Sequence, residues 1–117
     1  ASALHVLIFY MESIAWEGAL ARKTFGGTPE EVRPHAFYAF NQGFYNLFLA
    51  LQAIIGVVLA ALGYAAIGAA LILAGTGAML AAAVVLALAS APHRSAAAKQ
   101  GTFPLLAVVC TLAALLG

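Results

Sequence analysis

Charged residues are scarce in this sequence. Its 117 residues include five Lys and Arg, four Glu and no Asp, so that only 8% are charged. A soluble domain usually carries about 25% charged residues. By contrast, 65% of the residues are hydrophobic, and they form runs longer than the roughly 20 residues that a bilayer span needs. This composition predicts an integral membrane protein whose main partner is the lipid bilayer.

Other absences narrow the chemistry. The single cysteine, Cys110, excludes an internal disulfide and a metal site built from cysteines. His5 and Glu12 alone fall short of three or four ligands, so we expect no metal and no cofactor. The net charge of +1 and the lack of a basic stripe with interleaved aromatics argue against a nucleic-acid partner. No phosphate-binding loop and no nucleophile beside a base can be read in the chain.

Four apolar segments fill nearly the whole chain. They cover approximately Ala1–Ala21, Ala36–Leu62, Ala65–Ala91 and Gly101–Gly117. The first three are long enough to cross a bilayer as helices, and the fourth is short. We therefore predict an all-α fold, a bundle of four transmembrane helices that forms one domain over residues 1–117.

Glycines indicate how the middle segments pair. The short turn Leu62-Gly63-Tyr64 predicts a tight antiparallel hairpin between the second and third segments. Small residues in the third segment allow close contact between helices. The glycines concerned are Gly68, Gly75 and Gly77.

The two charged loops predict the orientation. Arg22–His35 contains Thr28, Pro29 and Glu31, the pattern of a capping box that starts a short interfacial helix. A second basic loop covers Pro92–Gln100. All five basic residues lie in these two loops and none in the turn between the second and third segments; they are Arg22, Lys23, Arg33, Arg94 and Lys99. By the positive-inside rule, we expect both loops in the cytoplasm and both termini outside, in a multi-pass protein of the bacterial inner membrane.

A polar run interrupts the second apolar segment. Its hydrogen-bonding side chains are costly to bury in hydrocarbon unless they are paired, and on a helical wheel they share an arc of about 140° with Gln52. They belong to Asn41, Gln42, Tyr45 and Asn46. Gln and Asn in such helices often serve only as interhelical hydrogen bonds, and this is our interpretation of Gln52 and Thr76.

Glu12 is the one carboxylate in the middle of the first apolar segment. Placing it at the midplane costs at least ~2.5 kcal/mol and usually marks a functional site. Counted from the charged loops, Glu12 and Asn46 lie at the same depth, about 15 Å in. The same count pairs Trp16 with Gln42, and His5 with Gln52, and places His5, Glu12 and Trp16 on one helix face. We expect Glu12 to be protonated, or held ionised by several donors.

Five short motifs of this sequence occur together in a known protein family. They are His5…Glu12…Trp16, Phe25-Gly26…Thr28-Pro29-Glu30, Asn41-Gln42-Gly43-Phe44-Tyr45-Asn46, Ala74-Gly75 and Gln100…Pro104. The chain resembles, over nearly its whole length, a family of small four-helix bacterial membrane proteins catalogued as a domain of unknown function. It departs from the family at Ser13, where the family tends to have Met, and in having fewer residues before His5.

The resemblance implies four spans and no particular activity. The functional residues that it implies are His5, Glu12, Asn41, Gln42, Tyr45, Asn46 and Gln100.

We expect a protein that binds or transports a small amphipathic or lipid-like ligand. Its pocket would be lined by Glu12, Trp16, Gln42, Tyr45 and Asn46, with Glu12 as the protonatable anchor. One alternative is an intramembrane enzyme that uses His5 and Glu12 as an acid–base pair.

Two further alternatives remain. In the first, the protein is an accessory subunit whose polar face docks a larger membrane complex, or a homo-oligomer whose polar face docks a second copy. A small-multidrug-type proton antiporter shares the length, the four helices and the first-helix Glu. Such proteins often insert in both orientations, however, and the charge bias of the loops argues against that here.

Overall fold

Three long apolar helices dominate the protein. The computed structural model describes residues 1–117, and it is helical throughout, with no strand. The long helices are α4 (Ala36–Ala61), α5 (Ala65–Ala89) and α6 (Arg94–Leu116), and each is long and apolar enough to cross a membrane. The all-α prediction is confirmed, and the second and third predicted segments match α4 and α5 to within about two residues at each end.

The first apolar segment is not one spanning helix, so the prediction of a continuous helix over Ala1–Ala21 is wrong. Helix α1 (Ser2–Phe9) runs into a π-helical turn, η1 (Tyr10–Ile14), and the backbone leaves the helix at Ala15 (φ −120°, ψ 43°). A separate short helix, α2 (Ala19–Phe25), begins after Gly18. Residues Ser2–Ile14 span about 20 Å as a helix, less than the roughly 30 Å of a hydrocarbon core.

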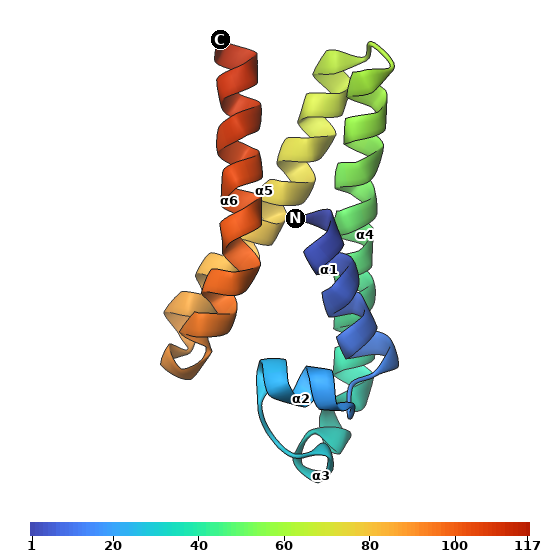
Figure 1. The fold of residues 1–117 in the computed structure, drawn as a ribbon, viewed down its shortest axis with the longest axis vertical. Helices are drawn as coiled ribbons and strands as arrows, with labels where there is room; N and C mark the ends of the chain where they lie inside the picture. The colour runs from blue at the N-terminus through green and yellow to red at the C-terminus, as the bar shows by residue number, and fades with distance from the viewer.

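The helices are arranged around a diverging pair (Figure 1). Helices α4 and α5 meet at the upper end, at the turn around Gly63, and separate towards the lower end, where α5 meets α6; α5 and α6 in turn lie apart at the upper end. Helix α1 lies against the lower half of α4, where the Ser2 hydroxyl donates a hydrogen bond to the Ala50 carbonyl (3.2 Å). The chain therefore begins at mid-height and ends at the upper end.

A seam of glycines holds α4 against α5. A Cβ on Gly68 would lie 2.6 Å from the Gly56 carbonyl oxygen, and one on Gly75 would lie 3.2 Å from the Leu49 carbonyl oxygen. Only glycine permits backbones to approach so closely. Gly77 is different, because a Cβ there would meet nothing within 4 Å. The predicted role in helix contact thus holds for Gly68 and Gly75.

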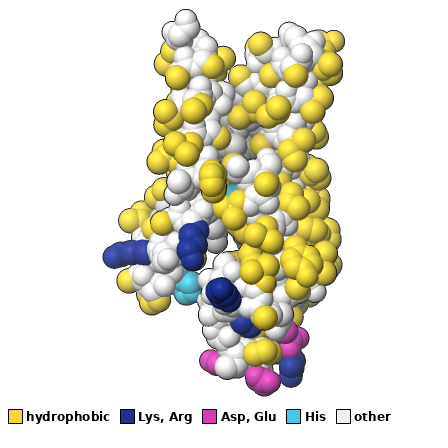
Figure 2. Space-filling view, in the orientation of Figure 1, with side chains coloured by type: hydrophobic (Ala, Val, Ile, Leu, Met, Phe, Trp, Pro, Cys, Tyr) yellow, Lys and Arg dark blue, Asp and Glu magenta, His cyan; other side chains and the backbone are white.

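The lower end carries the charged residues (Figure 2). Helix α3 (Pro29–Val32) starts with the predicted capping box: the Thr28 hydroxyl accepts from the Glu31 N–H (3.2 Å), and the Glu31 carboxylate accepts from the Thr28 N–H (3.1 Å). A 3-10 turn, η2 (Arg33–His35), leads into α4.

The predicted second basic loop, Pro92–Gln100, is mostly helical. After a 3-10 turn, η3 (Ala91–His93), helix α6 begins at Arg94, seven residues before the predicted start at Gly101. The nearby charges led to the prediction of a loop, but the alanines after Arg94 are strong helix formers and favour a helix.

Candidate functional site

A polar cleft opens between the two halves of the lower part of the molecule. One wall comes from α1, η1, α2 and α4, and the other from α5, η3 and α6; the cleft has a volume of about 420 Å³. We call it the central cleft. Six of the eight predicted site residues line it: His5, Glu12, Gln42, Tyr45, Asn46 and Gln100. Ten of its 16 lining residues are hydrophobic, among them Leu49, Met79 and Leu86, so it offers polar groups within an apolar wall.

Glu12 makes the predicted contact with Asn46. The Asn46 side-chain N–H donates to Glu12 Oε1 (2.7 Å) and also to the Gln42 carbonyl of its own helix (3.2 Å). A charge-assisted hydrogen bond of this kind is among the stronger ones in proteins when the carboxyl is ionised. Glu12 lies in the π-helical turn, and such turns are frequent at functional sites.

Ser13 and Gly43 set the distance between these two elements. The Ser13 hydroxyl donates to the Phe40 carbonyl (2.7 Å), and a Cβ on Gly43 would overlap the Ser13 hydroxyl and lie 3.0 Å from its Cβ. The sequence reading treated Gly43 only as part of the polar motif and missed this contact. The sequence does hold a signal for this contact. A glycine inside a helix costs about 1 kcal/mol relative to alanine, so its presence between hydrogen-bonding residues indicates a close packing contact.

The other two predicted residues, Trp16 and Asn41, line a second cavity of about 370 Å³ beside the first. We call it the side cleft. Glu12 and Gln42 line both cavities. The structure therefore brings all eight predicted residues to two adjoining cavities that meet at Glu12 and Gln42.

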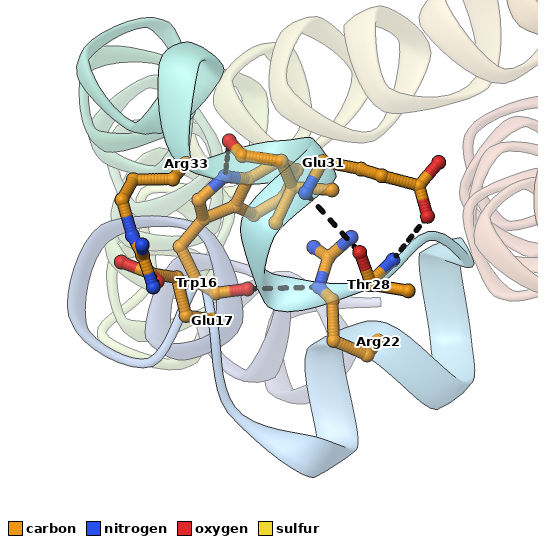
Figure 3. Close-up of polar contacts among 7 residues, drawn as sticks. Trp16, Glu17, Arg22, Thr28, Glu31 and Arg33 are labelled. Atoms are coloured by element: carbon orange, nitrogen blue, oxygen red, sulfur yellow. Dashed lines mark hydrogen bonds and ion pairs between the residues drawn. The ribbon is translucent and has the colours of Figure 1, made fainter.

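Trp16 does not lie on the Glu12 face of a continuous helix, as predicted, because the helix ends before it. Its indole N–H donates to the Val32 carbonyl (2.8 Å), and the Arg22 guanidinium lies 4.3 Å from its ring centroid (Figure 3). The Arg22 side chain also donates to the carbonyls of Trp16 (3.0 Å) and Gly26. Trp16 thus ties the loop between η1 and α2 to α3.

Two arginines are fixed in this region by different means. Partial burial lowers the pKa of Arg22, and a hydrogen bond from Arg33 to the Glu17 carboxylate raises the pKa of Arg33. The Glu17–Arg33 pair is exposed, with a nitrogen–oxygen distance of 2.7 Å. Both guanidinium groups stay protonated at physiological pH, so this end of the molecule keeps its positive charge.

His5 is buried, with 2% of its surface exposed. Its Nδ1 lies 3.0 Å from the Ala1 carbonyl oxygen, and since a carbonyl only accepts, Nδ1 carries the proton and Nε2 is left as an acceptor. The structure has no hydrogen bond between His5 and Gln52, and the expectation that they lie at the same depth stays a prediction.

His93 is a cleft residue that sequence reasoning missed. It lies in η3, on the wall opposite Glu12, and its Nδ1 is 2.6 Å from the Ser90 hydroxyl. Nothing in its sequence context marks it, because its position depends on how far α5 diverges from α4. No group of three or more His, Cys, Asp or Glu side chains in the chain could hold a metal ion.

The chemistry of the cavities follows from these residues. Neither cavity is lined by Lys or Arg, and the basic side chains that line them are histidines: His5 and His93 in the central cleft and His35 in the side cleft. The carboxyl group of Glu12 can exchange a proton or accept a hydrogen bond from a cationic or hydroxyl group. The amides of Gln42 and Gln100 make no hydrogen bond to another side chain and add donors and acceptors.

The comparisons agree with the resemblance noted from the motifs. Residues 1–112 match the model of a family described as a protein of unknown function (DUF1304). Neither the curated proteins nor the solved structures gave a match. With its family model covering the sequence almost from end to end, the chain belongs to the DUF1304 family of proteins of unknown function.

Proposed function

We propose that this is an integral protein of the bacterial cytoplasmic membrane that binds or transports a small amphipathic or lipid-like ligand in the central cleft. The observation that carries the proposal is the position of Glu12, hydrogen-bonded to Asn46 in a mainly apolar cavity that no Lys or Arg lines. Polar groups inside the membrane are costly and usually functional. The apolar wall suits a hydrocarbon chain, and the carboxyl and amides suit its head group.

The distribution of charge supports an orientation for this protein. Both basic regions lie at the lower end of the molecule, next to the open end of the central cleft (Figure 2). We place this end in the cytoplasm by the positive-inside rule, with the C-terminus on the outer side and the start of α1 directed outwards. In this placement the ligand reaches Glu12 from the cytoplasmic leaflet.

An acid–base enzyme is the second candidate. His5 and Glu12 line the same cleft, and the hydrogen bond at Nδ1 leaves His5 Nε2 free to take a proton. One residue able to accept a proton and one able to donate it are the minimum for general acid–base catalysis.

Glu12→Gln tests the proposal, because it removes the titratable proton at almost constant shape. The protein in phosphatidylcholine nanodiscs would be titrated with oleylamine and with oleyl alcohol across pH, using the fluorescence of Trp16, the only tryptophan. We expect the wild type to bind with pH-dependent affinity. Glu12→Gln should fold, lose the pH dependence and bind oleylamine about tenfold more weakly, the size expected for one hydrogen bond to a charged group.

Glu17→Gln is the matched control. Glu17 is an exposed carboxylate on the same segment, paired with Arg33 and outside both cavities. Its removal should leave binding unchanged. If the wild type binds both probes without pH dependence, or if Glu12→Gln binds as well as the wild type, the proposed role of Glu12 is wrong.

A further inference from the structure

A second, smaller groove lies beside the central cleft, between α1 and α6. Its volume is about 200 Å³. Leu4, Leu7 and Met11 form an apolar wall on α1 and η1, and Lys99 and Gln100 form a polar end on α6. We call it the α1–α6 groove. It shares Ile8, Phe25, Ala96 and Gln100 with the central cleft.

Lys99 is the charged residue of this groove. No Glu or Asp lines the groove, and Lys99 makes no hydrogen bond or ion pair within the chain. Arg22, Arg33 and Arg94 each donate hydrogen bonds to other residues of the chain. Lys23 also lacks a partner, but it does not line a cavity. A single uncompensated ammonium at the end of an apolar groove is complementary to an anionic head group on a hydrocarbon chain.

Two neighbours of Lys99 add a hydrogen-bond donor and a hydrogen-bond acceptor to the groove. Gln100 is half-buried and makes no hydrogen bond in the structure, so its amide can donate to a phosphate oxygen. The Thr24 hydroxyl already donates to the Leu20 carbonyl (2.8 Å) and is left as an acceptor. Lys99 lies at the charged end of the molecule, and basic pockets between transmembrane helices on the cytoplasmic side bind anionic lipid head groups.

We propose that the α1–α6 groove binds an anionic phospholipid from the surrounding leaflet. Its head group is held by Lys99 and Gln100, and one acyl chain lies along Leu4, Leu7 and Met11. Because four residues line both this groove and the central cleft, the bound lipid packs against the wall of the ligand site. This goes beyond the proposed function and does not depend on Glu12.

Trp16 provides a way to test it. Phe25 lines the groove, and its ring centroid lies 6.0 Å from that of Trp16, so a brominated acyl chain in the groove should quench the fluorescence. Nanodiscs of phosphatidylcholine would carry a minor fraction of either brominated phosphatidylglycerol or brominated phosphatidylcholine with identical chains. We expect the wild type to prefer phosphatidylglycerol about fivefold, which corresponds to about 1 kcal/mol for one basic residue near the membrane surface.

Variants of α6 separate the groove from general surface charge. Lys99→Gln should remove the preference, and Lys99→Arg should retain it. Arg94→Gln is the control, because Arg94 carries the same charge in a different groove between α5 and α6, and it should keep the preference. Equal quenching by both lipids in the wild type, or an equal loss in Lys99→Gln and Arg94→Gln, would overturn the proposal.

The variant Glu12→Gln keeps the two proposals apart. It should leave the preference for phosphatidylglycerol intact even though it weakens ligand binding in the central cleft. If it abolishes that preference, the lipid is bound at the cleft and the assignment to the α1–α6 groove is wrong.

Discussion

The contact between Ser13 and Gly43 determines where Glu12 can reach. Gly43 lets the turn η1 lie directly on α4, and the Ser13 hydroxyl fixes that position by its bond to the Phe40 carbonyl. Glu12 is the neighbour of Ser13 in the same turn, and it is thereby held 2.7 Å from the Asn46 amide. A packing residue in the polar run, Gly43, thus sets the position of the Glu12 carboxylate.

Gly43→Ala should therefore destabilise the protein. The new methyl group collides with Ser13, and overpacking of this kind costs about 1–3 kcal/mol of unfolding free energy. Ser13→Ala in the same chain removes the hydroxyl and should restore part of the loss. The measurement is unfolding in mixed micelles followed by circular dichroism. Gly77→Ala is the control, since its methyl group meets nothing; equal stability of Gly43→Ala and Gly77→Ala would contradict the close contact.

Asn46→Ala should cost more than Asn41→Ala. Asn46 is the donor that Glu12 has in the structure, and leaving a buried acceptor unpaired costs about 1–3 kcal/mol. Asn41 is exposed and makes no hydrogen bond through its side chain, so its loss should change stability by less than about 0.5 kcal/mol. A double-mutant cycle of Asn46→Ala with Glu12→Ala, which removes the acceptor, measures the coupling directly. Additive effects would show that the bond contributes nothing.

At the scale of elements, the break between η1 and α2 separates what the sequence predicts from what it does not. The length and composition of the apolar runs are local, and they locate α4 and α5 well. The depth match of Glu12 and Asn46 is confirmed by their hydrogen bond, because Glu12 lies before the break and Asn46 lies in the regular helix opposite it. The face shared by His5, Glu12 and Trp16 was wrong because hydrophobic periodicity carries no signal for a π-helical turn.

The far wall of the central cleft could not be predicted from the sequence, for a different reason. It depends on the angle between α4 and α5, which is set by backbone contacts at Gly68 and Gly75. Periodicity assigns a face to each helix but not an angle to a pair of helices. His93 was therefore missed, and Gln100 was predicted only from the family resemblance.

Arg22→Lys should loosen the segment that follows the break. Lysine cannot reproduce the bonds of a guanidinium to two carbonyls while lying over the Trp16 ring. We expect faster hydrogen exchange over residues 15–27 and a red shift of Trp16 emission. Arg33→Lys is the control: its pair with Glu17 is exposed to solvent and contributes little, so it should change neither. Identical spectra for both variants would show that Arg22 does not hold this segment.

For the whole molecule, the charged residues define one end. The regions around Thr28 and Ser95 lie at that end, and the turn at Tyr64 lies at the other (Figure 1). The positive-inside rule uses this uneven distribution of charge. The break in the first apolar segment does not change it, because the basic residues still lie at the lower end.

Cysteine labelling in cells tests the orientation. After Cys110→Ala, single cysteines would be introduced as Thr28→Cys, Tyr64→Cys and Ser95→Cys. A membrane-impermeant maleimide added outside should label Tyr64→Cys, and the other two should react only after the membrane is opened. Cell-surface labelling of Thr28→Cys or Ser95→Cys with protection of Tyr64→Cys would reverse the proposed topology.

The glycine seam between α4 and α5 separates two cavities of the protein. The cavity at the upper end, beside Cys110, shares no residue with the central cleft, and between them α4 and α5 touch backbone to backbone at Gly75 and Gly68. The central cleft is thus separate from the upper cavity in this conformation. Under the proposed function, passage of a ligand from the lower to the upper end would require these backbones to part, whereas binding from the lower end alone would not.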